Sequence, residues 1–397
     1  VGVLLAIPVG IGAVRNLAPL PVYLVCRSVV AISRSLQEII VALLFVAVFG
    51  FGPFAGFLTL TFATIGFIAK LLADDIEEID EAQAVREMYA YMDAGITAFD
   101  CADIYTGVED LIGAFRRDAK ANGGTDLLDR LKVHTKCVPD LDKLATIRKA
   151  DVEATIDRSL RRLDAERLDL VQFHWWDLGV PRYLEVASWL SEMQAAGKID
   201  RLGTTNYNTD CMIALDGAGF DMTSIQLQYS LIDRRPRKRI VDFCAAKNIN
   251  LLCYGTVAGG FLSDKWLGVD EPTGALENRS LTKYKLIIED IGGWDVFQSL
   301  LRLLRDIADK HDTDIASIAM RSMLLEPQVT AIIVGVRHDG HLGRHARVFD
   351  IALDDDDLAR IEAELDRHDV VAGDVYDVER DRDGRHGRIM KYNLNEA

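Results

Sequence analysis

Residues 151–174 read DVEATIDRSLRRLDAERLDLVQFH, a helical pattern followed at once by a short apolar strand. Four apolar residues recur at helical spacing and so share one face: Val152, Ile156, Leu160 and Leu163. The segment LDLVQFH that follows is mostly apolar, which is typical of a strand buried in a parallel sheet. One helix-then-strand unit is therefore predicted here.

The same alternation runs from about residue 81 to residue 335. It predicts seven strands, each preceded by a helix: ITAFD (96–100), LKVHTK (131–136), LDLVQFH (168–174), RLGTTN (201–206), SIQLQYS (224–230), NLLCYGT (250–256) and AIIVG (331–335). Eight such units close a (β/α)8 barrel, with the active site at the carboxyl ends of the strands. We therefore expect an α/β fold of the TIM-barrel type that lacks its first strand. An open doubly wound sheet is the alternative, but no GxGxxG turn follows any strand.

A different pattern precedes the barrel. No charged residue occurs from Ile39 to Ala69, a run longer than the roughly 20 residues that cross a bilayer core. We predict a transmembrane, apolar helical segment over residues 1–75, with Pro53 separating two helices, and a second domain over residues 76–397. The alternative is a buried helical hairpin of a soluble protein, although few soluble helices are apolar on every face.

Charge and cysteine content exclude several classes of protein. The formal net charge is -16, with 45 Lys+Arg against 61 Asp+Glu, whereas a nucleic-acid binder needs a basic surface. We therefore expect no nucleic-acid partner. The six cysteines show no CxxC pair and no Cys/His ligand spacing, so neither a disulfide framework nor a metal site is predicted.

Polar residues follow three successive strands where each of them ends. Asp100 closes the first strand and Tyr105 follows it, while Lys136 and His174 close the next two. Because the carboxyl ends of barrel strands face a common mouth, we expect these four side chains to form a proton-transfer set. The residues alone also allow a barrel lyase that uses Lys136 as a Schiff-base amine.

The same residues resemble the aldo-keto reductase family from about Glu81 to the C-terminus. DCADIY supplies the Asp and Tyr of the family pattern, HTK its Lys and QFHWW its His. The resemblance implies an NAD(P)-dependent oxidoreductase that interconverts a small aldehyde, ketone or sugar and its alcohol. Tyr105 would then donate or accept the proton, Lys136 held by Asp100 would favour the phenolate, and His174 would orient the carbonyl.

The resemblance also implies a cofactor site, with NADP(H) slightly preferred and NAD(H) as the alternative. Asn206, beside Thr205, and Gln226 would bind the nicotinamide carboxamide, and Tyr254 would stack on the ring. Phosphate contacts are expected near Gly255, Thr256, Gly259 and Leu262, and in the loop after the last strand at Gly335, Arg337, His341, Arg344 and His345. Trp175 and Trp176 are expected to line the substrate pocket.

The first 80 residues resemble a different family. RNLAP, RSLQEIIVALLFV, GFGPFAGFLTL and IGFIAKLLADDIEEID are similar to the membrane permease of a phosphonate-type ABC transporter. This resemblance stops before the cytoplasmic loop through which such permeases bind their ATPase. The implied alternative function is a transporter fragment with an inactive barrel appendage.

Three expectations concern the whole chain. We expect membrane anchoring through residues 1–75 with the catalytic module on the cytoplasmic side, or a cytoplasmic protein if that segment is not part of the native product. We expect the tail from Val370 to Ala397 to fold over the barrel mouth. Because both resemblances are interrupted near residue 80 and the first strand is missing, we expect the chain to be poorly stable or weakly active.

Overall fold

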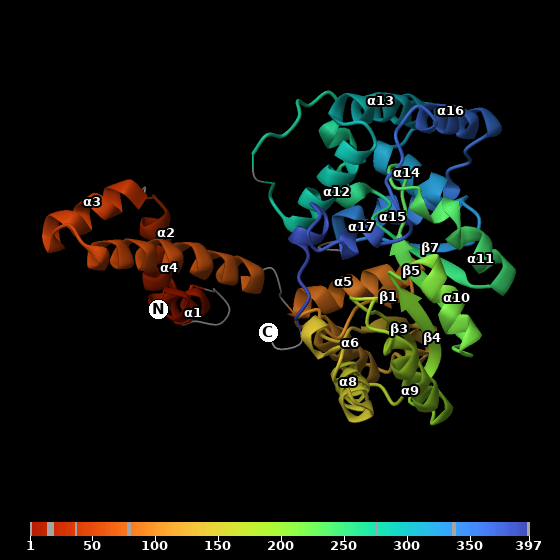
Figure 1. Cartoon of the computed structure of the whole chain (residues 1–397), viewed down its shortest axis with the longest axis horizontal. Helices are drawn as coiled ribbons and strands as arrows, with labels where there is room; N and C mark the ends of the chain where they lie inside the picture. Colours follow the sequence, from red (N-terminus) through yellow and green to blue (C-terminus); the bar gives the residue numbers. More distant parts are fainter. Residues whose placement is uncertain are drawn as a thin grey trace. The chain divides into compact units, whose positions relative to one another are not determined.

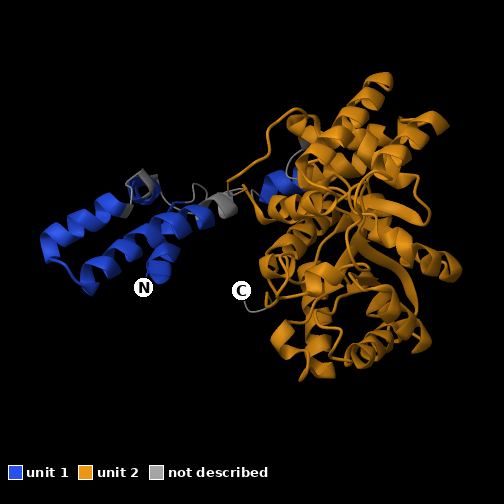
Figure 2. Cartoon of the chain, turned by 45° about the horizontal axis from the view of Figure 1, so that its top comes forward, with its two compact units in different colours: residues 1–86 blue, residues 87–397 orange. Residues whose placement is uncertain are grey.

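The structure is a computed structural model that describes residues 2–13, 20–35, 38–77, 81–274, 276–335 and 339–394. The chain divides into two compact units, residues 1–86 and residues 87–397, which are coloured separately in Figure 2. Each unit is described by itself. The boundary at residues 75/76 expected from the sequence stays a prediction.

Unit 1 contains four apolar helices. They are α1 (Gly2–Gly12), α2 (Leu20–Ser35), α3 (Glu38–Phe49) and α4 (Pro53–Glu77). The predicted break at Pro53 is confirmed, because α3 ends at Phe49 and α4 begins at the proline, which fits the first turn of a helix. Among the described residues, one helical stretch, Pro53–Leu72, is long and apolar enough to cross a membrane.

Small side chains bring the helices of unit 1 together. Ala6, Ala13, Val30 and Ala69 form its buried core, and a Cβ added to Gly10 of α1 would overlap α4 at Leu72. Most of the large apolar side chains that the described structure leaves exposed also lie in this unit. Close packing through small residues with apolar surface turned outward is typical of membrane helices.

Unit 2 is a parallel sheet of seven strands in the order β1-β2-β3-β4-β5-β6-β7, with helices around its outer face (Figure 1). The strands are β1 (Ala98–Asp100), β2 (Lys132–Cys137), β3 (Leu168–Phe173), β4 (Ile199–Thr205), β5 (Met222–Gln228), β6 (Asn250–Tyr254) and β7 (Val329–Ile333). All seven predicted strands are confirmed. The expected near-barrel without a closing eighth strand is therefore present.

Helices precede or follow each strand. The first, α5 (Glu81–Asp93), begins in unit 1 and ends in unit 2. The others are α6 (Val108–Ala121), α7 (Thr125–Arg130), α8 (Lys149–Arg162), α9 (Tyr183–Ala195), α10 (Thr209–Gly217), α11 (Ile240–Lys247), α12 (Arg279–Asp290), α13 (Trp294–Lys310), α14 (Ile315–Leu324), α15 (Leu342–Arg347), α16 (Asp355–Leu365) and α17 (Asp377–Arg380). Helices α12 and α13, which were not predicted from the sequence, lie between β6 and α14 along the chain.

Strand register brings the predicted polar residues to one end of the sheet. Lys136 on β2 pairs with Gln172 on β3, and Thr205 on β4 pairs with Gln226 on β5. Alternate residues of a strand point to the same face. The carboxyl ends of the strands therefore form one polar mouth.

The C-terminal tail packs against unit 2. The backbone N–H of Leu394 donates to Asp140 Oδ1 at 2.8 Å, and that of Leu141 donates to the carbonyl of Tyr392 at 3.2 Å. The Tyr392 ring also packs edge-on against Trp176, with 5.2 Å between ring centroids. The predicted docking of the tail is confirmed for the residues described up to 394.

Candidate active site

The Asp100 carboxylate is the centre of the polar mouth. Its Oδ2 accepts a hydrogen bond from Lys136 Nζ at 2.7 Å, and its Oδ1 accepts bonds from Gln226 Nε2 at 2.7 Å and Gln172 Nε2 at 3.2 Å. These donors come from β5, β2 and β3. Side chains from four strands therefore meet at one carboxylate.

Lys136 carries a charge beside Tyr105. Its side chain is 5% exposed. The ammonium also donates to the Cys101 carbonyl at 2.8 Å and lies 5.2 Å from the centroid of the Tyr105 ring. Burial alone would lower the pKa of Lys136, but Tyr105 and Asp100 outweigh burial and raise it. Tyr105 itself is 43% exposed. The arrangement is thus a fixed ammonium next to an accessible phenol.

His174, directly after β3, is buried and neutral. Its Nδ1 lies 3.1 Å from the Thr205 carbonyl oxygen. Burial, followed by the charge of Arg380, lowers the pKa of His174 to about 3. Because a carbonyl oxygen only accepts, Nδ1 carries the proton and Nε2 is the acceptor. Nε2 is buried and has no hydrogen-bond partner among the described residues.

Asn206 and Tyr254 meet at the ends of β4 and β6. The Tyr254 hydroxyl donates to Asn206 Oδ1 at 2.8 Å. Asn206 adopts a left-handed backbone conformation with φ of 62°, which is uncommon for a residue other than glycine and is often found at functional sites. Thr205 is buried and reaches His174 through its backbone carbonyl.

The loop after β6 and helix α12 offer groups that fit the phosphates of a dinucleotide: Thr256 from the loop and Lys283 from the helix. Thr256 Oγ1 is buried with no hydrogen-bond partner among the described residues. Lys283 Nζ lies 5.0 Å from the centroid of the Tyr254 ring, with Glu379 as a carboxylate neighbour at 4.0 Å. A buried hydroxyl and an ammonium beside Tyr254 suit an anionic group.

Gly255, Gly259 and Leu262 shape that loop. Gly255 and Gly259 have φ of 74° and 64°, and a Cβ on either would overlap Tyr284 of α12. Leu262 is fully buried, and its N–H donates to the Val257 carbonyl at 3.2 Å. These residues are therefore explained by packing of the loop on α12, and their predicted phosphate contacts stay predictions.

The loop after β7 contains the remaining predicted cofactor residues. Arg344 Nε forms an ion pair with Asp314 at 2.7 Å, and His345 Nδ1 lies 3.3 Å from the Tyr91 hydroxyl of α5. Gly335 and His341 are exposed. Arg337 lies outside the described residues. A 2'-phosphate at Arg344 would compete with Asp314.

The two tryptophans differ in their hydrogen bonding. Trp175 is fully buried and donates from Nε1 to the Val180 carbonyl at 2.9 Å. Trp176 packs edge-on against His174, with 4.3 Å between ring centroids, and its buried Nε1 has no partner among the described residues. Trp176 therefore offers a polar group beside His174, whereas Trp175 packs the loop.

Several residues of this site were not predicted from the sequence. Gln172 stands two positions before His174, so the period of two along a strand was an available signal. Arg380 and Lys283 come from segments without a strand-end pattern, and no comparable signal marks them, whereas Tyr376 belongs to the tail that was expected to fold over the mouth.

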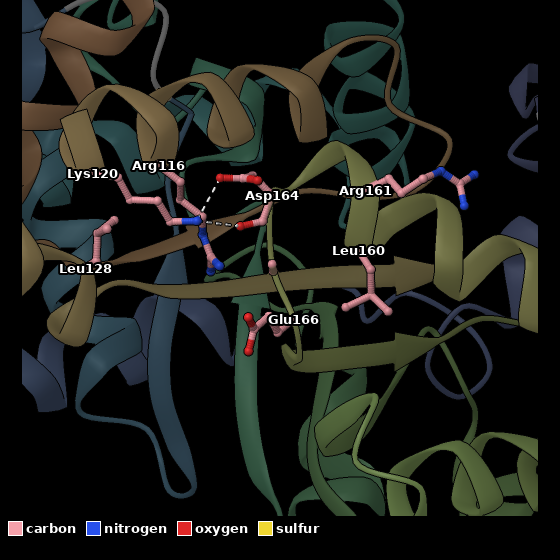
Figure 3. Close-up of a pocket in the computed structure, with 8 residues that line it drawn as sticks. Arg116, Lys120, Leu128, Leu160, Arg161, Asp164 and Glu166 are labelled. Carbon is pink, nitrogen blue, oxygen red and sulfur yellow. Dashed lines mark hydrogen bonds and ion pairs between the residues drawn. The ribbon is translucent and has the colours of Figure 1, made fainter.

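A separate cleft lies near the opposite ends of the strands (Figure 3). It is lined by residues of α6, α7, α8 and the loop before β3: Arg116, Lys120, Leu128, Leu160, Arg161, Asp164, Ala165 and Glu166. Lys120 Nζ donates to Asp164 Oδ2 at 2.8 Å. The loop with Asp164, Ala165 and Glu166 leads into the amino end of β3, whereas the candidate site is at the carboxyl ends of the strands. The cleft is therefore not part of the candidate site.

Comparison with protein families finds a match that covers most of unit 2 and the last part of unit 1. The model of the aldo/keto reductase family matches residues 65–366. The aldo-keto reductase YhdN of Bacillus subtilis (strain 168) is 24% identical over 292 residues, covering 72% of this chain and 85% of its own. A glycerol dehydrogenase from Gluconobacter oxydans shares the fold, with a TM-score of 0.62, 24% identity and coverage of 75% and 89% of the two chains.

Two further relatives match only in part. Flagellar radial spoke protein 5 of Chlamydomonas reinhardtii is 28% identical over 253 residues, which are 55% of this chain and 48% of that protein, so the chain spans about half of that relative's length. The phosphate-import permease protein PhnE of Mycolicibacterium smegmatis (strain ATCC 700084 / mc(2)155) is 45% identical over 91 residues, which are 22% of this chain and 17% of the permease. The chain is thus similar to two unrelated families.

Proposed function

The chain belongs to the aldo/keto reductase family, and on this premise we propose that it interconverts a small carbonyl compound and its alcohol with Tyr105 as the proton donor and acceptor. The observation that carries the proposal is the buried Lys136 ammonium, held by Asp100 at 2.7 Å and lying over the Tyr105 ring. An accessible phenol beside a fixed positive charge is suited to acid and base catalysis.

A bound nicotinamide dinucleotide would supply the hydride in reduction and accept it in oxidation. We propose NADP(H), with NAD(H) as the alternative. Asn206 and Tyr254 would hold the nicotinamide end. Thr256 and Lys283 would bind the phosphates.

In reduction, the Tyr105 hydroxyl would give its proton to the carbonyl oxygen as negative charge develops there. The Lys136 ammonium would stabilise the phenolate that forms, and solvent would restore the proton to exposed Tyr105. Asp100 would act as a positioning residue, because its oxygens accept from Lys136 and from two glutamines. In oxidation the Tyr105 phenolate would accept the proton of the alcohol.

His174 would hold the substrate through its bare Nε2. An unprotonated nitrogen accepts a hydrogen bond, so this geometry suits the hydroxyl of an alcohol or of a hydroxylated carbonyl compound. The sequence resemblance implied that His174 orients the carbonyl oxygen, which needs a donor. The tautomer set by Thr205 favours the acceptor role.

The test is Tyr105→Phe, which removes the proton donor and retains the ring. We expect carbonyl reduction to fall by about 10²- to 10⁴-fold, while nicotinamide fluorescence shows nearly unchanged dinucleotide binding. Tyr89→Phe is the matched control, because Tyr89 bonds Asp118 on α6 and has no place in the site. If Tyr105→Phe retains most of the turnover, the assignment is wrong.

A Schiff-base lyase is less well supported. Imine formation needs a neutral amine, whereas Asp100 and Tyr105 raise the pKa of Lys136 and keep it charged. Borohydride trapping of a covalent adduct at Lys136 in the presence of an aldehyde would reverse this ranking.

We also propose that α4 anchors the chain in a bilayer and that the barrel lies on the cytoplasmic side, where Lys70 would face the headgroups. The apolar stretch Pro53–Leu72 and the similarity to a permease support this location. Protease added to sealed inside-out vesicles should digest the barrel. Protection of the barrel would contradict the orientation, and recovery of a native product without residues 1–75 would point to a cytoplasmic protein instead.

A further inference from the structure

Gln172 is a buried amide inside the barrel and the register partner of Lys136 on the neighbouring strand. Its Nε2 donates to Asp100 Oδ1 at 3.2 Å, and Gln226 Nε2 donates to the same oxygen at 2.7 Å. The other carboxylate oxygen, Oδ2, accepts from Lys136 at 2.7 Å. Two neutral amides therefore occupy one oxygen of Asp100 and leave the other to the ammonium.

The second half of the Gln172 amide makes no hydrogen bond. Its Oε1 is buried without a partner within the part of the chain that the structure describes. A half-satisfied buried amide is costly, and an apolar residue such as Leu170, two positions earlier on the same face of β3, fills such space without that cost. The bond to Asp100 is therefore what distinguishes Gln172 from an apolar side chain.

The ammonium of Lys136 has three N–H groups to distribute. One donates to Asp100 Oδ2 and one to the Cys101 carbonyl at 2.8 Å, while the Tyr105 ring centroid lies 5.2 Å away. A carboxylate that turned its second oxygen to the ammonium would offset more of the positive charge and draw it from Tyr105. The two amides prevent this by holding Oδ1.

The titratable groups around Asp100 come from the loop after β1, from β2 and from the end of β3: Cys101, Tyr105, His134, Lys136 and His174. Burial raises the pKa of Cys101 to about 12. Burial also lowers the pKa of His134, the register partner of Asp100, and lowers that of His174 to about 3. These three side chains are uncharged between about pH 7 and about pH 10, so the charge near Asp100 in this range is that of Lys136 and of the phenolate.

We propose that Gln172 is a positioning residue, which by bonding Asp100 Oδ1 leaves the Lys136 charge available to stabilise the Tyr105 phenolate. This rests on the proposed function. A carboxylate that accepts fewer hydrogen bonds attracts a neighbouring cation more strongly. Gln172 therefore sets the pH range in which the phenolate forms and an alcohol is oxidised.

The first test is Gln172→Met, which removes the donor and retains a side chain of similar length. The full-length protein in detergent is titrated, and the near-ultraviolet phenolate band of Tyr105 is isolated by subtracting the same titration of a variant that also carries Tyr105→Phe. We expect the band to appear at a pH higher by at least about 0.5 unit, which is about a threefold change in the ionisation equilibrium.

The second measurement is the oxidation of benzyl alcohol by NADP+. The pH profile of kcat/KM should move upward in Gln172→Met by the same amount as the phenolate band. The KM for NADP+ should change by less than about twofold, because Gln172 acts on proton transfer and not on dinucleotide binding.

Gln228→Met is the matched control. Gln228 is also a buried amide on β5, its Nε2 donates to Asp233 Oδ2 at 2.6 Å, and its Oε1 has no partner among the described residues. Asp233 pairs with Arg235, which also bonds Glu379 of α17 at 2.8 Å. The same type of hydrogen bond is thus removed from a structural ion pair, and the phenolate band should not move.

An unchanged band in Gln172→Met, or an equal shift in Gln228→Met, would overturn the positioning role. If the band shifts as expected but benzyl alcohol is not oxidised although NADP+ binds, the proposed function fails and the positioning role stands. If Gln172→Met does not fold, Gln172→Glu decides the question. Its ionised carboxylate repels Asp100 and disfavours the phenolate, so the band must again move to higher pH, and a band at the wild-type position would exclude the role.

Discussion

Replacing Glu379 with Gln should destabilise unit 2 by about 3 kcal/mol. Burial alone would raise the pKa of Glu379, but Arg235 and Lys283 outweigh burial and lower it from its usual 4.5 to about 2. At about 1.4 kcal/mol per pH unit, this difference is equivalent to about 3 kcal/mol of stability at neutral pH. Removing one partner of a buried ion pair typically costs about 3 to 5 kcal/mol, which agrees with that magnitude.

The assay is denaturant unfolding of the full-length protein in detergent, followed by near-UV circular dichroism at pH 7. Glu185→Gln makes the same chemical change in an exposed pair with Arg182 and should cost less than about 1 kcal/mol. Since the folded-state pKa of Glu379 is lowered, its stabilisation is present above about pH 4.5 and is lost as the pH falls towards 2. The reasoning is refuted if Glu379→Gln unfolds at the same midpoint as Glu185→Gln.

Two other substitutions test the charges around the reaction centre. Lys136→Met should slow alcohol oxidation and shift its pH profile to higher pH, because the Tyr105 phenolate loses its ammonium neighbour. Lys132→Met is the control, since the Lys132 side chain is exposed. An unchanged pH profile of kcat/KM would show that Lys136 and Tyr105 are not coupled. His174→Asn should flatten the loss of stability on acidification from about pH 6.5 to about pH 3, because unfolded His174 gains a proton there and folded His174, with its pKa of about 3, does not. Unfolding free energies at pH 7 and pH 5 measure this slope, and equal slopes in wild type and variant would contradict a buried neutral imidazole.

Local patterns were sufficient to predict the strands and the residues at their ends. A strand in a parallel sheet is short and apolar, and the residue that closes it lies at the mouth, so Asp100, Lys136 and His174 could be placed without any tertiary information. The hydrogen bond from Gln226 to Asp100 joins residues 126 positions apart. The curvature of the sheet brings β5 opposite β1, and the periodicity of the sequence cannot predict that Gln226 and Asp100 lie within hydrogen-bonding distance.

In the C-terminal tail, local sequence patterns predict less of what the structure shows. Met390, Tyr392 and Leu394 alternate with polar residues along the tail, a pattern that predicts docking, but it gives no reason to single out Glu379 or Arg380. The role of Glu379 depends on Arg235, which is 144 positions earlier and is buried with Asp233 and Glu379 as its carboxylate partners. From the sequence alone, a charged residue within a run of charged residues is predicted to be exposed to solvent, because its buried partner is distant in the sequence.

The open seam of the barrel bears directly on the candidate site. Within the described residues β1 pairs only with β2, and β7 only with β6. Each buried backbone group left unpaired there costs about 1 to 3 kcal/mol, which is a large part of a typical domain stability of about 5 to 15 kcal/mol. These energies are the reason to expect weak stability, which stays a prediction.

Asp100 lies on this edge strand, which is only three residues long. Its position therefore depends less on backbone pairing than on the three side chains that bond it from β2, β3 and β5. On the outer side of the seam, Tyr91 of α5 contacts His345 of α15 at 3.3 Å, so that helices flanking the two edge strands meet. Because Asp100 and its bonds to Lys136, Gln172 and Gln226 lie at an open edge of the sheet, the candidate site is directly linked to this edge.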